Sequence, residues 1–268
     1  MPQKTKLHWP NIFWLTLAHA MVLVAIPFFT WGALAVCLIG LFVVTPLGVN
    51  LGFHRLASHR ALKVPGWLEY FLITLGAMVG GGPPLHWIAE HRLHHRYSDT
   101  EMDPHDANQG FWFAHMTHLF RHKEFEDVEE QWMKYVPDFK DSRYHRFLNR
   151  YWILFALIPA IFLYLWGGLP YLFWGGFVRV VLMLHITWFV NSATHMWGYR
   201  NYETSDLSRN CWWVGLLAAG EGWHNNHHAQ PASAAHGHRA WEFDFTYLLI
   251  RFLGFLGLAT EIKLPKMR

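Results

Sequence analysis

The sequence has few cysteines and few charged residues. Its two cysteines, Cys37 and Cys211, are too few for a disulfide framework or a cysteine-based zinc site. Charged residues make up 15% of the 268 positions, the formal net charge is +3, and no nucleic-acid-binding motif occurs. These shortages exclude a disulfide-stabilised secreted module, and we expect no nucleic-acid partner.

Apolar and aromatic residues are abundant instead. Hydrophobic residues reach 53%, and the 16 tryptophans are typical of chains that meet a membrane–water interface. Four apolar runs are predicted to cross a hydrocarbon core as helices, at residues 11–29, 31–50, 152–166 and 171–190. Short uncharged links join the first run to the second and the third to the fourth, which predicts two helical hairpins. Arg179 lies inside the fourth run, and we expect its side chain to reach the far interface.

The basic residues indicate the topology. Each predicted hairpin has an uncharged link at one end, and the basic residues flank its opposite end. The positive-inside rule therefore places these basic ends, and with them both chain termini, in the cytoplasm. We therefore predict an all-α integral membrane protein with a single domain, 1–268, and a helical cytoplasmic cap formed by residues 51–150 and 191–268. Of two shorter apolar segments, 67–79 is expected to be interfacial or re-entrant and 245–258 to lie on the membrane.

Clustered histidines carry the chemistry, because neutral imidazole is a common metal ligand and such clusters are hard to explain by packing. The clusters, with one further histidine after the fourth run, are His54 with His59, His91 with His94 and His95, His224 with His227 and His228, and His195. Residues three or four apart share a helix face, so each triplet converges, and Asn191 shares a stripe with His195. His54 and His59 are five apart and fit one helical face poorly. A helix end between them would let each serve a different metal.

The number of ligands favours two metal ions. One zinc ion takes about four ligands, fewer than nine histidines provide. Two iron ions, each with about five protein contacts and an open position for O2, would use them all. Magnesium and calcium prefer oxygen ligands. The positive-inside topology places all three clusters on the cytoplasmic side, so the sequence predicts a di-iron centre there.

These motifs resemble the histidine boxes of the membrane fatty acid desaturases, more narrowly the Δ9 type. The resemblance covers roughly residues 52–231. It rests on Gly52-Phe-His-Arg-Leu-Ala-Ser-His59, His91-Arg-Leu-His-His95 with the trailing Asp103-Pro-His105, Asn191-Ser-Ala-Thr-His195, and Gly220-Glu-Gly-Trp-His224-Asn-Asn-His-His228. It implies that the nine histidines ligate two irons and that Asn191 completes one ligand set, directly or through water. It also implies four spans with a cytoplasmic cap, in agreement with the charge pattern.

The resemblance implies an O2-dependent oxidoreductase. Such an enzyme removes two hydrogens from adjacent methylenes of a saturated acyl chain, leaves a cis double bond at Δ9, and forms water. An unactivated chain must be held in a narrow apolar tunnel, and Thr187 and Trp188 match family positions near its bend. Carboxylates are expected to orient the imidazoles, and the candidates are Glu90, Asp103, Asp106 and Glu221.

Two departures from the family pattern bear on partners. The sequence has no His-Pro-Gly-Gly haem-binding stretch and no fused b-type cytochrome domain, so we expect ferredoxin or a separate cytochrome as the electron donor. Ala89-Glu90 stands where animal acyl-CoA members carry Arg-Asp, which favours a glycerolipid acyl chain over acyl-CoA without excluding it. These features indicate a bacterial or cyanobacterial form, in the plasma membrane or the thylakoid.

Two other interpretations stay open at this point. Related di-iron hydroxylases and alkane monooxygenases share histidine boxes, although with more spans and other spacings. A non-enzymatic metal-binding membrane protein would also hold clustered ligands. A transporter, however, needs polar ligands at mid-membrane, whereas here nearly all of them lie at one edge.

Overall fold

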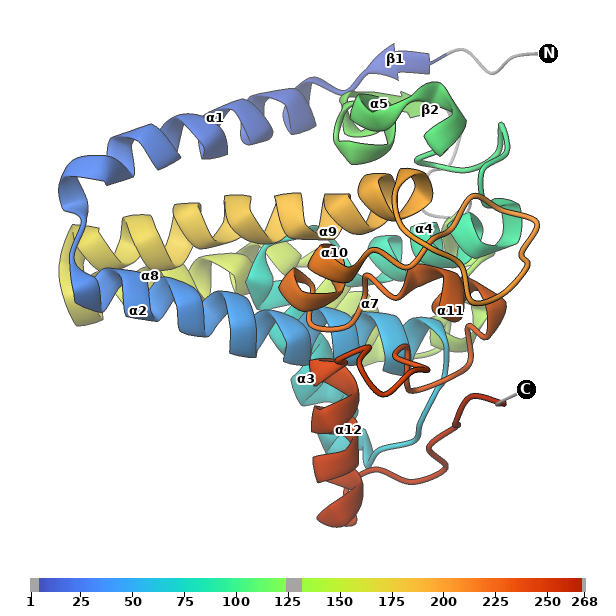
Figure 1. Cartoon of the computed structure of the whole chain (residues 1–268). Helices are drawn as coiled ribbons and strands as arrows, with labels where there is room; N and C mark the ends of the chain where they lie inside the picture. The colour runs from blue at the N-terminus through green and yellow to red at the C-terminus, as the bar shows by residue number, and fades with distance from the viewer. Residues whose placement is uncertain (1–4, 124–131, 267–268) are drawn as a thin grey trace.

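The structure is a computed structural model that describes residues 5–123 and 132–266, and the chain is mainly helical. The long helices α1, α2, α8 and α9 run side by side, and short helices gather at one end of this bundle (Figure 1). The elements are β1 (Thr5–Leu7), α1 (Trp9–Ala25), η1 (Ile26–Phe28), α2 (Trp31–Ile39), η2 (Gly40–Val44), η3 (Pro46–Ser58), α3 (Gly66–Val79), α4 (Pro84–Tyr97), η4 (Ala107–Gln109), α5 (Phe111–His115), η5 (Thr117–Phe120), β2 (Arg121–Lys123), η6 (Pro137–Phe139), α7 (Arg143–Arg150), α8 (Trp152–Tyr171), η7 (Leu172–Val178), α9 (Arg179–Met196), α10 (Trp212–Leu217), α11 (His224–Ala229) and α12 (Phe245–Phe255).

Within the described residues, three helical segments are long and apolar enough to cross a membrane: Trp9–Phe28, Trp31–Ser58 and Trp152–Met196. The third segment is not one straight rod. Gly167 and Gly168 have non-helical backbone angles inside it, and Gly168 has a φ of 65°, which glycine adopts without steric cost. The predicted runs 152–166 and 171–190 lie on either side of this break. η7 follows it and packs against α1, α2 and α8.

The second apolar run continues further than the sequence predicted. We expected it to end near residue 50, but α2, η2 and η3 form one unbroken helical segment as far as Ser58. Much of this segment is π-helical, with backbone bonds between residues five apart, and such stretches occur often at functional sites. The extension carries His54 on the long helix itself.

The prediction for Arg179 was wrong. Its side chain does not extend to a surface; it is buried among the helices, with 8% of its surface exposed. The guanidinium donates to the carbonyl of Gly175 at 2.8 Å and to that of Val79 at 3.3 Å. Gly40 makes room for it, because a Cβ atom there would lie 2.3 Å from Arg179 Cδ. Carbonyl acceptors and a neighbouring glycine therefore accommodate the charge inside the bundle.

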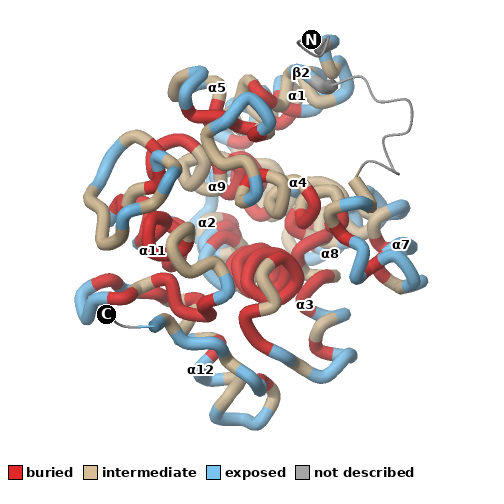
Figure 2. Tube along the Cα trace, turned by 90° about the vertical axis from the view of Figure 1, so that its right-hand side faces the viewer, coloured by how far each residue is buried: buried red, intermediate tan, exposed pale blue. Residues whose placement is uncertain are grey.

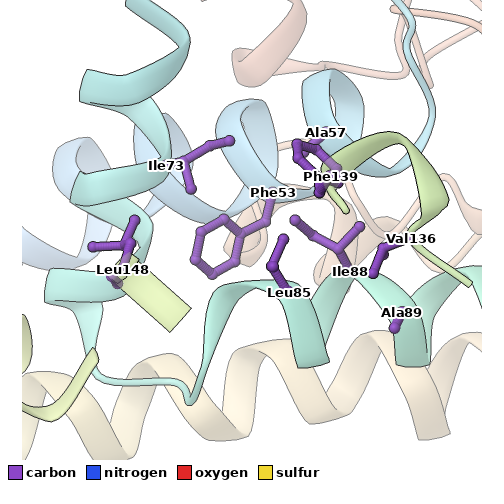
Figure 3. Close-up of a cluster of buried hydrophobic side chains, with 10 residues drawn as sticks. Phe53, Ala57, Ile73, Leu85, Ile88, Ala89, Val136, Phe139 and Leu148 are labelled. Atoms are coloured by element: carbon purple, nitrogen blue, oxygen red, sulfur yellow. The ribbon is translucent and has the colours of Figure 1, made fainter. Parts of the chain in front are cut away.

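α3 and α4 brace the end of the long second helix. Gly48 and Gly76 allow close approach, since a Cβ atom on Gly48 would lie 2.5 Å from the Gly76 nitrogen. Around this contact an apolar cluster gathers from η3, α3, α4, η6 and α7 (Figure 3). Phe53 and Ile88 belong to it. Phe53 directly precedes His54, and Ile88 lies one helical turn before His91. Packing of this cluster fixes how those histidines face one another.

Burial is concentrated where the short helices meet the long ones. Buried backbone gathers in the centre of the cross-section near α2, α4 and α11, whereas α12 lies at the periphery with many exposed residues (Figure 2). α3 and α12 are apolar but too short to be spans. At the other edge, β1 pairs with β2 in antiparallel register, with Lys6 opposite His122.

Candidate metal centre

The nine predicted histidines come from four separate parts of the chain and meet in two groups. His54 lies on η3 and His59 just after it, the second cluster lies on α4, His195 lies on the last turn of α9, and the third cluster forms α11. In each group every member offers one ring nitrogen within 4.8 Å of the others. The five-histidine group is His54, His59, His91, His95 and His227, and the four-histidine group is His94, His195, His224 and His228.

The Nε2 atoms point at one another. In the five-histidine group, His227 Nε2 lies 3.1 Å from His54 Nε2 and 2.8 Å from His95 Nε2. In the four-histidine group, the Nε2 atoms of His224 and His195 are 3.1 Å apart. Two nitrogens bound at right angles about 2.1 Å from one ion are about 3 Å apart. The spacing is therefore that of neighbouring ligands on one metal ion.

Carboxylates fix the tautomers in the four-histidine group. The Nδ1 atoms of His94, His195 and His228 each lie 2.9 Å from a carboxylate oxygen, of Asp103, Asp99 and Asp206 respectively. A carboxylate only accepts, so Nδ1 carries the proton and a neutral ring presents a lone pair at Nε2. Nε2 of His94 and Nε2 of His228 are nevertheless only 3.3 Å apart. Two facing lone pairs repel unless a cation lies between them, and a metal ion satisfies both.

The electrostatics favour neutral rings. Burial lowers the pKa of His91, His95 and His227 well below the usual histidine range, and neighbouring imidazoles lower it further. Neutral imidazole is the form that binds metals. In the five-histidine group, Glu221 Oε2 lies 2.7 Å from His54 Nδ1. Burial alone would raise the pKa of Glu221, but Arg55 and the neighbouring histidines bring that pKa well below its usual value, so Glu221 is a carboxylate.

His54 and His59 lie in the same group, so the expectation of a different metal for each was wrong. The reason is the π-helical backbone of η3, whose wider turns bring residues five apart closer to one face than an α-helix does. The His59 N–H donates to the His54 carbonyl at 3.1 Å, the five-residue bond of a π-helix. The wider π-helical turn thus brings the two rings to one side, whereas an α-helix would have pointed them apart.

The remaining predicted residues fall into two sets. Asn191 and Thr187 line a cavity together with His54, His91, His94 and His224. Trp188 is buried beside this cavity, in a cluster with Met183 and Leu184. Asp103 and Glu221 lie against ligand candidates, as described above.

Glu90 and Asp106 are placed differently from the prediction. Glu90 lies on α4 with its charge near His118. Asp106 accepts from the backbone N–H of Asn108 and begins η4. Within the described part of the chain, neither side chain is hydrogen-bonded or ion-paired to any of the nine histidines.

Two carboxylates of the site were missed by the sequence analysis. Asp99 follows α4 and bonds His195, and Asp206 lies in the loop before α10 and bonds His228. Both lie in irregular segments, where no helical spacing relates them to the histidines that they contact. Of the two, only Asp99 could have been suspected from the sequence, because it lies four residues after His95.

Replacing Asp206 with asparagine tests the importance of these carboxylates. The amide cannot match the charge of a carboxylate on His228 Nδ1, so we expect metal affinity at the four-histidine group to fall roughly 10–100-fold. The measurement is metal bound per chain during titration of purified protein with iron. Glu203→Gln, an exposed change in the same loop, is the control. Equal affinity in the Asp206 variant and in the control would contradict the prediction.

An apolar cavity adjoins both groups. Its walls include Leu41, Val49, Met183 and Ile186 on the side of the long helices, and Ala218 and Ala219 on the opposite side. The histidines named above line it as well. A chain of methylenes lying in this cavity would therefore pass directly in front of the metal-binding groups.

Comparison with known proteins agrees with this geometry. The sequence profile of the family described as "Fatty acid desaturase" matches residues 29–247. The chain is 45% identical over 261 residues to an sn-1 stearoyl-lipid 9-desaturase of Synechocystis, covering 96% of this chain and 80% of that protein. It is 43% identical over 264 residues to an sn-1 stearoyl-lipid 9-desaturase of Anabaena variabilis, covering 97% and 96%.

A plant relative is named for a different double-bond position from that of the two cyanobacterial proteins. The palmitoyl-monogalactosyldiacylglycerol delta-7 desaturase of Arabidopsis thaliana is 45% identical over 251 residues, 92% of this chain and 66% of that protein. The family match and these identities confirm the enzyme class predicted from the histidine boxes. The chain belongs to the fatty acid desaturase family, and it is an oxidoreductase that acts on fatty acyl chains.

Proposed function

We propose that the chain is an acyl-lipid Δ9 desaturase, which introduces a cis double bond into a saturated acyl chain esterified in a glycerolipid. The observation that carries this proposal is the meeting of two imidazole groups at an apolar cavity that members of both groups line. The names of the two cyanobacterial relatives, both stearoyl-lipid 9-desaturases, support the position and the carrier. The pair Ala89-Glu90 supports the same carrier, because it adds no positive charge for a CoA phosphate.

The metal that fits these donors is iron. The five-histidine group would hold one ion, and the four-histidine group with Asn191 would hold the other. Nitrogen donors with positions left open suit iron that uses O2. Bound iron supplies the oxidation that unactivated methylenes require. Each double bond takes two hydrogens from the acyl chain, two electrons from an external donor and two protons, and reduces one O2 to two waters.

The residues of the chain supply position and a dry environment. Leu41, Val49 and Met183 hold the methylenes by apolar contact and exclude water from the cavity. Thr187 on α9 faces the same space, and Trp188 supports its wall from behind. Asp99, Asp103 and Asp206 keep three imidazoles in one tautomer and one orientation. Register along the chain, and hence the double-bond position, follows from this fit.

The proposed topology has four spans in two hairpins, with the break at Gly167 and Gly168 dividing the third segment into two. Both termini and the metal centre would lie on the cytoplasmic side of a plasma or thylakoid membrane, in one domain. The positive-inside pattern supports this arrangement.

The electron donor is proposed to be a separate carrier, a ferredoxin or a cytochrome. The two cysteines of the sequence are fewer than the four thiolates that an iron–sulfur cluster commonly takes. The electrons would come from this carrier as a partner protein.

Expression in a host that lacks unsaturated-lipid synthesis tests the proposal. Fatty acids from each lipid class are isolated, and their double-bond positions are mapped by mass spectrometry. We expect Δ9 cis products in glycerolipids, and none in the His227→Ala variant. A hydroxylated chain would assign the enzyme to the related hydroxylases. Products confined to acyl-CoA would contradict the proposed carrier, and iron binding without any oxidised lipid would favour a non-enzymatic metal-binding protein.

A further inference from the structure

The loop after α11 brings a tenth histidine against the five-histidine group. His236 is fully buried, with 0% of its surface exposed. Its ring centroid lies 4.3 Å from that of His227, and the two rings are inclined by 33°. Its Nδ1 lies 3.1 Å from Glu221 Oε2. Neither the box motifs nor the ligand count assigns a role to this residue.

His227 is a ligand candidate whose outer ring nitrogen is buried and, among the described residues, unpaired. Its Nε2 lies between those of His54 and His95, in the centre of the group. A histidine that binds metal usually donates its other ring N–H to a carboxylate, a carbonyl or water, and this contact fixes the ring. His227 Nδ1 has no hydrogen-bond partner among the residues that the structure describes. Ring packing against His236 is the contact that takes the place of such a bond.

His236 also reaches a second member of the group, through Glu221. Glu221 Oε2 lies 2.7 Å from His54 Nδ1 and 3.1 Å from His236 Nδ1, and Oε1 accepts from Arg55. Arg55 donates hydrogen bonds to one oxygen of this carboxylate. The two imidazoles lie within ion-pair distance of the other oxygen, which accepts no hydrogen bond from the residues that the structure describes. Removal of His236 would free one side of this carboxylate and the face of His227 together.

These atoms do not form a further metal site, although His54, Glu221 and His236 each offer a donor within 4.8 Å of the others. Arg55 donates two hydrogen bonds to Glu221 Oε1, at 3.2 and 2.9 Å. A second cation on this carboxylate would lie beside a buried guanidinium, and the two charges repel strongly in such surroundings. The contacts therefore favour positioning over ligation.

The four-histidine group has a comparable arrangement. His105 is buried, and its ring centroid lies 4.2 Å from that of His94, with the rings inclined by 38°. Its Nδ1 lies 3.7 Å from Asp103, the carboxylate that bonds His94. Here the ligand candidate, His94, has its own hydrogen bond to Asp103, so the ring of His105 is less critical. The comparison marks His236 as the stronger of the two supports.

We propose that His236 is a positioning residue of the desaturase, which holds His227 by ring packing and His54 through Glu221. It thereby sets the metal affinity of the five-histidine group. This inference rests on the two-iron centre proposed above.

The test uses the purified full chain in detergent, with iron as the probe. His236→Leu removes both contacts, His236→Phe keeps a ring against His227, and His238→Leu is the matched control. His238 is a buried histidine of the same loop that bonds Tyr202 and the Ala235 carbonyl. Iron per chain, its loss to a chelator and the Mössbauer spectrum of bound ⁵⁷Fe are measured. Thermal unfolding of each variant is followed before iron is added.

We expect wild type to hold two irons and His236→Leu to hold about one, with the affinity for the second roughly 10–100-fold weaker. His236→Phe should retain more iron than His236→Leu, and His238→Leu should match wild type. If His236→Leu does not fold, the phenylalanine variant decides, because it lacks the Glu221 contact and must still bind the second iron more weakly than wild type.

Two irons in every variant with an unchanged spectrum would overturn the role of His236 and leave the two-iron centre standing. Equal iron loss in His238→Leu would overturn it as well, because the effect would then be general to the loop. Fewer than two irons in wild type would overturn the proposed centre, and this inference with it.

Discussion

Replacing His227 with alanine is expected to abolish double-bond formation and to remove one of the two irons. His227 Nε2 is the atom that two other nitrogens of the five-histidine group approach, at 3.1 and 2.8 Å. The side chain is 1% exposed, so a shortened residue leaves a buried gap in the middle of the group. Loss of a ligand should cost more than the roughly 10–100-fold that removal of an outer hydrogen-bond partner costs.

Two measurements check this prediction: the double-bond content of host lipids and the iron bound per purified chain. His238→Ala is the control, because it truncates a buried histidine of the adjoining loop that contacts none of the nine. The control should keep both activity and iron. Removal of a residue that only hydrogen-bonds a ligand costs roughly 10–100-fold in activity. A His227 variant that retained more than about a tenth of the wild-type activity would therefore show that His227 is not a ligand.

The histidine spacing predicted the site better than it predicted the backbone that builds it. The triplets on α4 and α11 converge because residues three and four apart share a helical face. The same rule failed for His54 and His59. Their convergence depends on the π-helical turns of η3, and π-helix has no propensity pattern comparable to that of α-helix. Sequence periodicity therefore located both residues but assigned them to different metals.

The division of the nine histidines between two groups could not be derived from the sequence either. His94 and His95 are neighbours on α4, yet they belong to different groups. Adjacent helical residues point in directions about 100° apart, so one cluster can serve two sites. His227 and His228 divide in the same way. Which group each joins depends on how α4, α9 and α11 pack, which is a tertiary property.

Carboxylate partners were predicted only in part. Glu221 and Asp103 lie against ligand candidates, and both are close to a histidine box in the sequence. Asp206 reaches His228 from a loop that lies 22 residues earlier. Loop conformation is set by local turns, here the bonds from Ser208 to Asp206, and not by a repeating pattern. Contacts of this kind cannot be derived from spacing.

Apolar run lengths predicted long apolar helices and the break at Gly167 and Gly168, but not the buried charges. Gly167-Gly168-Leu169-Pro170 marks a turn in both sequence and structure. Arg179 was misplaced because its acceptors are backbone carbonyls of Gly175 and Val79, which no side-chain pattern reveals. Arg55, which is fully buried, lies within a histidine box, and the sequence gives no sign that its partners are Glu221 and Asp244.

Replacing Arg55 with methionine is expected to destabilise the protein by about 3–5 kcal/mol, the usual cost of leaving a buried charge without its partner. Arg55 has 0% of its surface exposed and bonds both Glu221 and Asp244, each at 2.9 Å. Without the guanidinium, two carboxylates face each other in a water-poor interior. The melting temperature of the purified, metal-free protein measures the effect.

Lys63→Met provides the control for charge removal. Lys63 pairs with Glu261 at 2.8 Å, but the two side chains are 69% and 62% exposed. Exposed pairs contribute about 0–1 kcal/mol, so the melting temperature of this variant should stay close to that of wild type. An Arg55 variant as stable as the Lys63 variant would contradict the prediction.

A double variant separates lost attraction from new repulsion. Asp244→Asn placed in the Arg55→Met background removes one of the two orphaned charges. Its amide oxygen can still accept from the backbone N–H of Tyr247, whereas the bond from the His236 N–H to the other carboxylate oxygen is lost. If carboxylate repulsion causes most of the loss, the double variant should be more stable than Arg55→Met alone, a non-additive result that marks directly coupled residues. If the loss comes mainly from the contact between Arg55 and the Ala234 carbonyl, the second change should bring no recovery. Because Glu221 also contacts His54, recovery of stability without recovery of iron affinity would assign to Arg55 a second effect, on the orientation of the five-histidine group.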